Sequence, residues 1–170
     1  MEYIGGEGAP NVALWKVQAG KQGEQERAIE HDLVAIGWNE LPDLSQINSI
    51  EALSELYTDI FPGKSSAHVT SVVAQIWAFK QRIRIGDLVI VPRKCRTIAI
   101  GIVTSDYRFR NDMGEDIRHT RHAKWLAKDM ARGSFDQDLL YSFRAAMTVC
   151  QVSRNEAEKR IRVMFNLRQN

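Results

Sequence analysis

The chain has 170 residues, of which 44% are hydrophobic and 26% charged, as is ordinary for one soluble globular domain with a sizeable core. No apolar run approaches the roughly 20 residues that span a bilayer, and the N-terminus lacks the basic and apolar regions of a signal peptide. Cys95 and Cys150 have no metal-ligand spacing, which indicates a reduced, cytoplasmic protein with packed thiols rather than a disulfide. We expect a flexible N-terminus over residues 1–11 and one domain over residues 12–170.

The net charge of +2 conceals an uneven distribution along the chain. Residues 1–79 contain 4 Lys and Arg against 11 Asp and Glu, a balance of −7, whereas residues 80–170 contain 19 against 10, a balance of +9. A basic half of this kind is typical of a face that binds a polyanion. The alternative is that the two halves interleave in the fold and that their charges form surface ion pairs.

The first half of the chain predicts short strands separated by amphipathic helices. Alternating apolar residues indicate the strands, and apolar residues spaced three and four apart indicate the helices. We expect strands over residues 12–18 and 33–38 and helices over residues 23–31, 49–60 and 66–80. Ser45 or Ser49 is expected to cap the helix that begins near residue 49.

Beyond residue 82 the apolar pattern changes from helical to alternating. We expect an antiparallel pair over residues 88–92 and 97–105, a polar loop over 110–118, further strands over 121–127 and 146–153, and a short helix within 131–145. Ser153 and Glu156 predict a capping box at the start of a closing helix. This order of elements argues for an α+β fold, in which helices pack around a small, strongly curved mixed sheet.

The sequence contains no recognisable catalytic motif. There is no GxxxxGK[ST], GxGxxG, HExxH, GxSxG or CxxC pattern, and no Lys has the acidic residue two positions before it that a metal-dependent nuclease site would need. His119 and His122 lie three apart, but the surrounding HTRHAKWL predicts a strand, in which such residues point to opposite sides. We expect His119 on a loop and His122 facing solvent or a phosphate. The chain is therefore expected not to be an enzyme and to hold no metal or cofactor.

Aromatic and basic residues point to a different activity. Trp38, Tyr107 and Phe109 are expected at strand exits, where their side chains can point into a pocket at the end of the sheet. The basic residues around them are Arg93, Lys94, Arg96, Arg108, Arg110, Arg118, Arg121 and Lys124. Aromatic faces replace base stacking and cations neutralise phosphate, so this combination is typical of a nucleic-acid groove. For the other three tryptophans we favour core packing.

Six segments carry a family resemblance through their order and spacing: LWKVQAGKQGE, VAIGWNELPDLS, IRIGDLVIVP, IAIGIVTSDYRFR, HTRHAKWL and TVCQVSRNEAEKRI. Over residues 12–162 they resemble the N-terminal DNA-recognition module of Mrr-type and related modification-dependent restriction proteins. That module is similar to the EVE and YTH branch of the PUA-like superfamily. The resemblance implies a pseudo-barrel that recognises DNA by extruding a modified, methylated base into an aromatic pocket.

The resemblance also implies which residues line that pocket. Trp38 occupies the place of a tryptophan that forms one wall. The other residues implied are Gln18, Ala19 and Gly20 after the first strand, Asn39, Asp43 and Ser45 in the turn beyond Trp38, and Tyr107 with Phe109. Asp43 can accept a hydrogen bond from an exocyclic amine of the base, or it can serve as an N-terminal helix cap. Contacts to the DNA backbone are expected from Arg93, Lys94, Arg96, Arg108, Arg110, Arg118 and Arg121.

In restriction proteins of this kind a nuclease or ATPase domain follows the module, whereas this sequence ends at residue 170. We therefore expect the specificity module of a prokaryotic defence system, with any cleavage in a separate domain or subunit. Two alternatives remain open. One is an RNA-binding reader of a modified base such as a methylated adenine. The other is a protein-interaction or sensing domain whose pocket holds a nucleotide-like small molecule.

Overall fold

A computed structural model describes residues 12–18, 23–144 and 146–167 of the chain. Its strands are β1 (Leu14–Val17), β2 (Leu33–Ile36), β3 (Leu88–Pro92), β4 (Thr97–Val103), β5 (Arg108–Phe109), β6 (His119–Ala131) and β7 (Val149–Gln151). They form one sheet in the order β2-β6-β4-β3-β1-β7, with β5 beside this path and paired to β6. The polar loop expected over residues 110–118 lies between β5 and β6. The flexible N-terminus expected over residues 1–11 lies outside the described residues.

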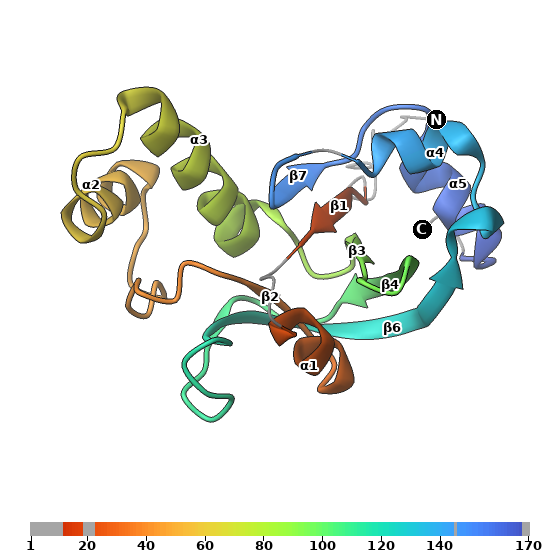
Figure 1. Ribbon diagram of the computed structural model, residues 1–170, viewed down its shortest axis with the longest axis horizontal. Coiled ribbons are helices and arrows are strands. Elements are labelled where there is room, and N and C mark those ends of the chain that lie inside the picture. Colours follow the sequence, from red (N-terminus) through yellow and green to blue (C-terminus); the bar gives the residue numbers. More distant parts are fainter. Residues whose placement is uncertain (1–11, 19–22, 145, 168–170) are drawn as a thin grey trace, which may run out of the picture.

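The sheet is mixed and strongly curved (Figure 1). β1 pairs in parallel with β3, and every other pairing along the sheet is antiparallel. A parallel pair needs a long crossover, which here contains the helices between β1 and β3. β1 and β2 also contact each other, so the sheet curls toward closure. The predicted α+β fold with a curved mixed sheet is confirmed.

The helices are α1 (Glu24–Glu30), α2 (Ile50–Ile60), α3 (Ser66–Trp77), α4 (Gln137–Ser142) and α5 (Ala157–Met164). A π-helical turn, η1 (Ala78–Arg82), extends α3, and a 3-10 turn, η2 (Arg132–Ser134), follows β6. Figure 1 shows α2 and α3 on one side of the sheet and α4 and α5 on the other. Ser49 caps α2 through a hydrogen bond from the backbone N–H of Ala52 (3.1 Å), as one of the two predicted caps.

Two layers of core lie on the two faces of the sheet. In β3, Val89 and Val91 pack into the cluster that includes α2 and α3, whereas Leu88 and Ile90 pack into the cluster that includes α4 and α5. A strand whose side chains pack alternately into two cores is buried on both faces, so its sequence is a continuous apolar run. This is why LVIV has no polar position.

Three expectations about local structure are wrong. The closing helix begins at Ala157 rather than near Ser153, and Glu156 stands at its N-cap with a φ of 51° and no side-chain cap. His119 is the first residue of β6 and fully buried, not a loop residue, because it pairs with Ile36 of β2. Cys95 is exposed in the turn between β3 and β4 rather than packed, whereas Cys150 is half-buried; both thiols are free.

Candidate nucleic-acid interface

Trp38 begins a tight turn just beyond β2. Its carbonyl oxygen accepts a hydrogen bond from the backbone N–H of Leu41 (3.0 Å). Its φ is 54°, in the left-handed region that bulky side chains rarely adopt. Such a conformation costs about 1–3 kcal/mol and persists only where surrounding contacts hold it. The indole is half-buried against the core, so the ring is not sealed inside the sheet.

Hydrogen bonds between this turn and the loop before β6 hold the turn in place. The Asn39 amide Nδ2 donates to the carbonyl oxygen of Asp116 (3.1 Å), and Nη1 of Arg118 donates to the carbonyl oxygen of Asn39 (3.4 Å). Asp116 is itself fixed by an ion pair with Arg27 of α1 (2.8 Å). The left-handed backbone at Trp38 is therefore stabilised by contacts from two distant segments.

His119 is the centre on which the predicted aromatic residues converge. The hydroxyl of Tyr107 lies 2.6 Å from Nδ1 of His119 and accepts a hydrogen bond from the backbone N–H of Leu44 (3.2 Å). The phenol oxygen has one hydrogen to donate and a second lone pair to accept with, so it can pair with Nδ1 in either tautomer of the imidazole. The ring centroid of Phe109 lies 5.5 Å from that of His119. We call Trp38, Asp43, Tyr107, Phe109 and His119 the Trp38 cluster.

Burial keeps the imidazole neutral. Desolvation lowers the pKa of His119 to about 4, against the opposing effect of the carbonyl oxygens of Trp38 and Leu41 and the carboxylate of Asp43. Those carbonyls face the ring without making a full hydrogen bond to Nε2, which is buried. Burial also raises the pKa of the Tyr107 phenol far above its usual range. The aromatic rings of the cluster are thus uncharged at neutral pH.

The lowered pKa of His119 predicts that the stability of the fold depends on pH. Because the unfolded chain binds the His119 proton more tightly than the folded one, the free energy of unfolding should fall as the pH drops from about 6.5 toward 4, by about 3 kcal/mol in total. Urea unfolding across this pH range measures the effect. A His119→Gln variant should lose this part of the slope while keeping the part due to carboxylates. Equal slopes in the two proteins would contradict the assignment.

Asp43 is exposed and shapes the turn in which it lies. Its Oδ1 accepts hydrogen bonds from the backbone N–H (2.9 Å) and the hydroxyl (2.6 Å) of Ser45. This contact closes an Asx-type turn, whereas the cap of α2 is Ser49. Within the described residues Oδ2 of Asp43 has no hydrogen-bond donor, so one oxygen is available to a ligand.

Some of the predicted pocket residues lie elsewhere. Gln18 is exposed and lines a hollow of about 320 Å³ on another part of the surface, together with Lys16, Arg132 and Arg144. Ala19 and Gly20 lie outside the described residues. The structure therefore brings Asn39, Asp43, Ser45, Tyr107 and Phe109 together with Trp38, and it places Gln18 apart.

The predicted backbone-contacting arginines and lysine fall into several groups. Arg93 pairs with Glu26 and Asp129 (2.5 Å to the latter), and Arg110 pairs with Asp112 (2.6 Å). Arg108 is exposed on β5, next to Phe109, and Arg118 is half-buried at the turn beyond Trp38. Arg118 is thus the predicted cation that contacts the turn of the Trp38 cluster, and Arg108 adjoins Phe109 of the cluster along the chain.

Lys94 and Arg96 are exposed but far from that cluster. They lie in the turn before β4, whereas Tyr107 follows the other end of this strand. β4 has 7 residues. At about 3.3 Å per residue, the two ends of such a strand lie roughly 20 Å apart. Any phosphate that they contact belongs to a different part of a bound strand.

Arg121 cannot contact a phosphate, which corrects the prediction made for it. It is 1% exposed, and its guanidinium donates to the carbonyl oxygens of Ser105 (3.0 Å), Phe79 (3.1 Å) and Ile83. Burial lowers its pKa. The side chain is a structural tie between β6, the loop after β4 and the segment that follows α3.

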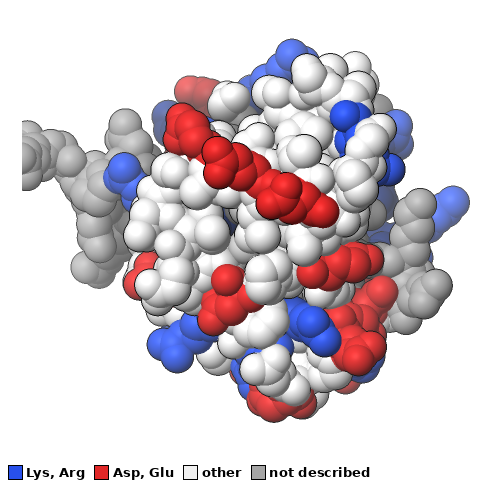
Figure 2. Space-filling view, turned by 90° about the vertical axis from the view of Figure 1, so that its left-hand side faces the viewer, with Lys and Arg blue, Asp and Glu red and all other residues white. Residues whose placement is uncertain are grey.

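The charge segregation of the sequence is only partly neutralised within the fold. Of the ion pairs among the described residues, Arg27–Asp116 and Arg93–Glu26 join the two halves, and the others lie within the basic half. Figure 2 shows a row of acidic side chains on the side of the molecule formed by α2 and α3. α2 carries the exposed residues Glu51, Glu55 and Asp59. This side is unsuited to a polyanion.

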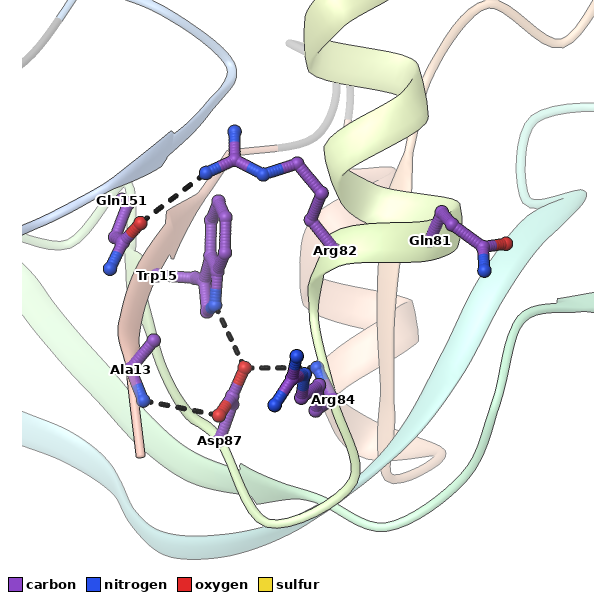
Figure 3. A pocket seen from close by; sticks show the side chains of 7 residues that line it. All are labelled: Ala13, Trp15, Gln81, Arg82, Arg84, Asp87 and Gln151. Atoms are coloured by element: carbon purple, nitrogen blue, oxygen red, sulfur yellow. Dashed lines mark hydrogen bonds between the residues drawn. The ribbon is translucent and has the colours of Figure 1, made fainter. Parts of the chain in front are cut away.

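A larger cavity, of about 500 Å³, lies at the start of β1 (Figure 3). Its lining residues are Ala13, Trp15, Gln81, Arg82, Arg84, Asp87 and Gln151. The Trp15 indole N–H donates to Oδ2 of Asp87 (3.0 Å), and the guanidinium of Arg82 lies 5.1 Å from the Trp15 ring centroid. Sequence reasoning missed this cavity because its walls come from three distant segments.

Two further findings concern the described residues. No group of three or more His, Cys, Asp and Glu side chains among them is arranged to hold a metal ion. No helix in the described part of the chain has the length and apolar character needed to cross a membrane.

The fold and the cluster define the class of protein: an α+β domain with a curved mixed sheet that presents an aromatic cluster bordered by arginines. The chain belongs to the family described as "Domain of unknown function (DUF8426)", whose model matches residues 15–151. No curated protein matches the sequence. One similar solved structure is the YTH domain of the Zygosaccharomyces rouxii MRB1 protein in complex with N6-methyladenosine RNA. It is 11% identical, with 96% of this chain and 90% of that chain covered and a TM-score of 0.48.

Proposed function

We propose that the chain is a non-catalytic DNA-binding module that recognises a modified, methylated base flipped out of the duplex at the Trp38 cluster. The observation that carries this proposal is the half-buried indole of Trp38 on a strained turn held by distant side chains. A glycine would adopt the same backbone conformation without strain, so the bulky aromatic residue here favours a role for its ring. Such a role exists where the ring must stand at one fixed angle to a ligand.

The cluster has the chemistry that an extruded base requires. Flipping a base costs a few kcal/mol. Stacking on an aromatic ring returns about 1–3 kcal/mol per base. The free Oδ2 of Asp43 can accept a hydrogen bond from an exocyclic amine. Tyr107 and Phe109, packed around the neutral ring of His119, supply the apolar surroundings that favour a methyl group.

Arg108 and Arg118 are the proposed phosphate contacts at this site. Arg118 contacts the turn that carries Trp38, Arg108 adjoins Phe109 along the chain, and neither arginine has a carboxylate partner among the described residues. Such contacts give affinity that does not depend on base sequence. This affinity falls as the salt concentration rises, because the counterions that binding releases from the phosphates then gain less entropy. The base pocket then supplies the selectivity.

We also propose that the module belongs to a modification-dependent restriction system, on the ground of the sequence resemblance to the Mrr-type recognition module alone. The described residues offer no cluster for a metal-dependent nuclease. In this proposal a separate nuclease or ATPase domain or subunit performs cleavage, and the module supplies specificity.

A titration against matched duplexes tests the proposal. Duplexes with and without 6-methyladenine, and with and without 5-methylcytosine, would be compared by fluorescence anisotropy at two salt concentrations. We expect one modified duplex to bind about 10- to 200-fold more tightly than its plain counterpart, because a hydrophobic pocket gains only that much from a methyl group. Equal binding of modified and plain duplexes would contradict the proposal.

Two competitors separate the related functions. Methylated single-stranded RNA that displaces the duplex at lower concentration would indicate an RNA reader instead. A free methylated nucleoside that binds as tightly as the polymer would indicate a small-molecule sensor. The proposed function predicts that the RNA and the nucleoside both compete weakly. Neither of them offers an extruded base together with the phosphates of two paired strands.

A further inference from the structure

The cavity at the start of β1 has a rigid floor. The carboxylate of Asp87 is 4% exposed and accepts three hydrogen bonds: from the backbone N–H of Ala13 (3.1 Å) and of Arg84 (2.9 Å), and from the Trp15 indole (3.0 Å). Both of its oxygens are therefore occupied by N–H donors. Figure 3 shows Trp15 standing between Asp87 and Arg82.

Two arginines at this cavity have no acidic partner. Neither Arg82 nor Arg84 forms an ion pair with a carboxylate among the described residues. The Arg82 guanidinium lies over the Trp15 ring, and its Nη2 makes one long hydrogen bond to Oε1 of Gln151 (3.4 Å). Most of the N–H donors on both exposed guanidinium groups thus remain available.

The pair of cations suits a phosphate. A planar guanidinium matches phosphate oxygens in a bidentate geometry, with charge-assisted hydrogen bonds. A volume of about 500 Å³ lies within the range of small-molecule pockets, so it admits a nucleoside as well as a phosphate. The amide of Gln151 adds a donor and an acceptor for a sugar or base.

We propose that this cavity binds the phosphate of a nucleotide, free or within a nucleic-acid strand, through the unpaired arginines that line it, Arg82 and Arg84. The site shares no lining residue with the Trp38 cluster. It therefore does not depend on the function proposed for that cluster, and the two can fail separately.

The indole N–H signals of the tryptophans give a direct test in the full ¹⁵N-labelled chain. The indole N–H of Trp15 donates to Asp87 in the floor of the cavity, so its resonance reports on this site. Trp38→Phe, Trp77→Phe and Trp125→Phe variants identify the other three signals. Adenosine 5′-monophosphate, adenosine and a short single-stranded DNA would each be titrated at millimolar concentrations.

The expected result is a saturable shift of the Trp15 signal with the monophosphate and no shift with adenosine. Arg84→Ala, which keeps the backbone N–H that Asp87 needs, should weaken binding roughly tenfold or more, since it removes charge-assisted hydrogen bonds. Arg154→Ala, a charge-matched control at an exposed position, should not.

The relative affinities of the two phosphate probes identify the source of the phosphate. Tighter binding of the DNA assigns the site to a strand, and equal or tighter binding of the monophosphate assigns it to a free nucleotide. Equal shifts with adenosine, no saturable shift with either phosphate probe, or unchanged binding by Arg84→Ala would overturn the proposal.

Discussion

Trp38→Ala is expected to bring the preference for the modified duplex from about 10- to 200-fold down to about one. The mutation removes the ring on which the extruded base would stack, and with it about 1–3 kcal/mol of binding free energy. The phosphate contacts at Arg108 and Arg118 stay in place, so the variant should still bind duplexes in a salt-dependent way. Paired titrations of modified and plain duplex measure the ratio.

Two control variants test whether this effect is specific to the indole of Trp38. Trp38→Phe keeps an aromatic face and should retain part of the preference. Tyr141→Ala removes an aromatic side chain that is 70% exposed on α4, and it should leave the preference unchanged. If Trp38→Ala is folded by circular dichroism and still prefers the modified duplex, the pocket lies elsewhere.

Arg121→Met is expected to destabilise the fold by about 3 kcal/mol or more, since each buried carbonyl left without a donor costs about 1–3 kcal/mol. The guanidinium satisfies the carbonyls of Ser105, Phe79 and Ile83, which methionine would leave buried without a donor. Urea denaturation measures the loss. Arg154→Met, at an exposed arginine, should change stability by less than about 0.5 kcal/mol.

The same experiment distinguishes a structural arginine from a DNA contact. A stable Arg121→Met variant with weaker and less salt-dependent DNA binding would contradict the structural role given to Arg121. Unchanged binding per folded molecule, together with a large loss of stability, is the expected result.

The sequence allowed much of the fold to be predicted because its local patterns agree with the final packing. The alternation in 88–92 and 97–105 corresponds to β3 and β4, and the helical spacing in 49–60 corresponds to α2. Ser49 provides a local cap that works in isolation. A capping box at Ser153 failed because a residue with positive φ, Glu156, starts α5 instead.

The errors concern residues whose roles depend on distant partners. His119 and Arg121 lie two apart in β6 and therefore share one face of the strand, where both are buried. Their polarity suggested a loop and a phosphate contact. Only the fold places Tyr107 against His119, and the carbonyls of Phe79 and Ile83 against Arg121. Sequence charge does not reveal burial of this kind.

The residues of the candidate site also divide into those that a local sequence pattern predicts and those whose position depends on distant segments. Trp38 was singled out because a large apolar residue stood beside a glycine and a polar turn, which is a local signal. The convergence of Tyr107 and Phe109 on His119 follows from the pairing of β5 with β6. The resemblance alone implies Gln18 in the same pocket, whereas the structure places it in another hollow.

The most direct test of the central claim is the indole N–H signal of Trp38, followed while the full chain is titrated with a modified duplex and its plain counterpart. If the modified base stacks on this ring, the Trp38 signal should shift strongly with the modified duplex and much less with the plain one. A modified duplex that binds tightly and leaves the Trp38 signal unmoved would contradict the claim.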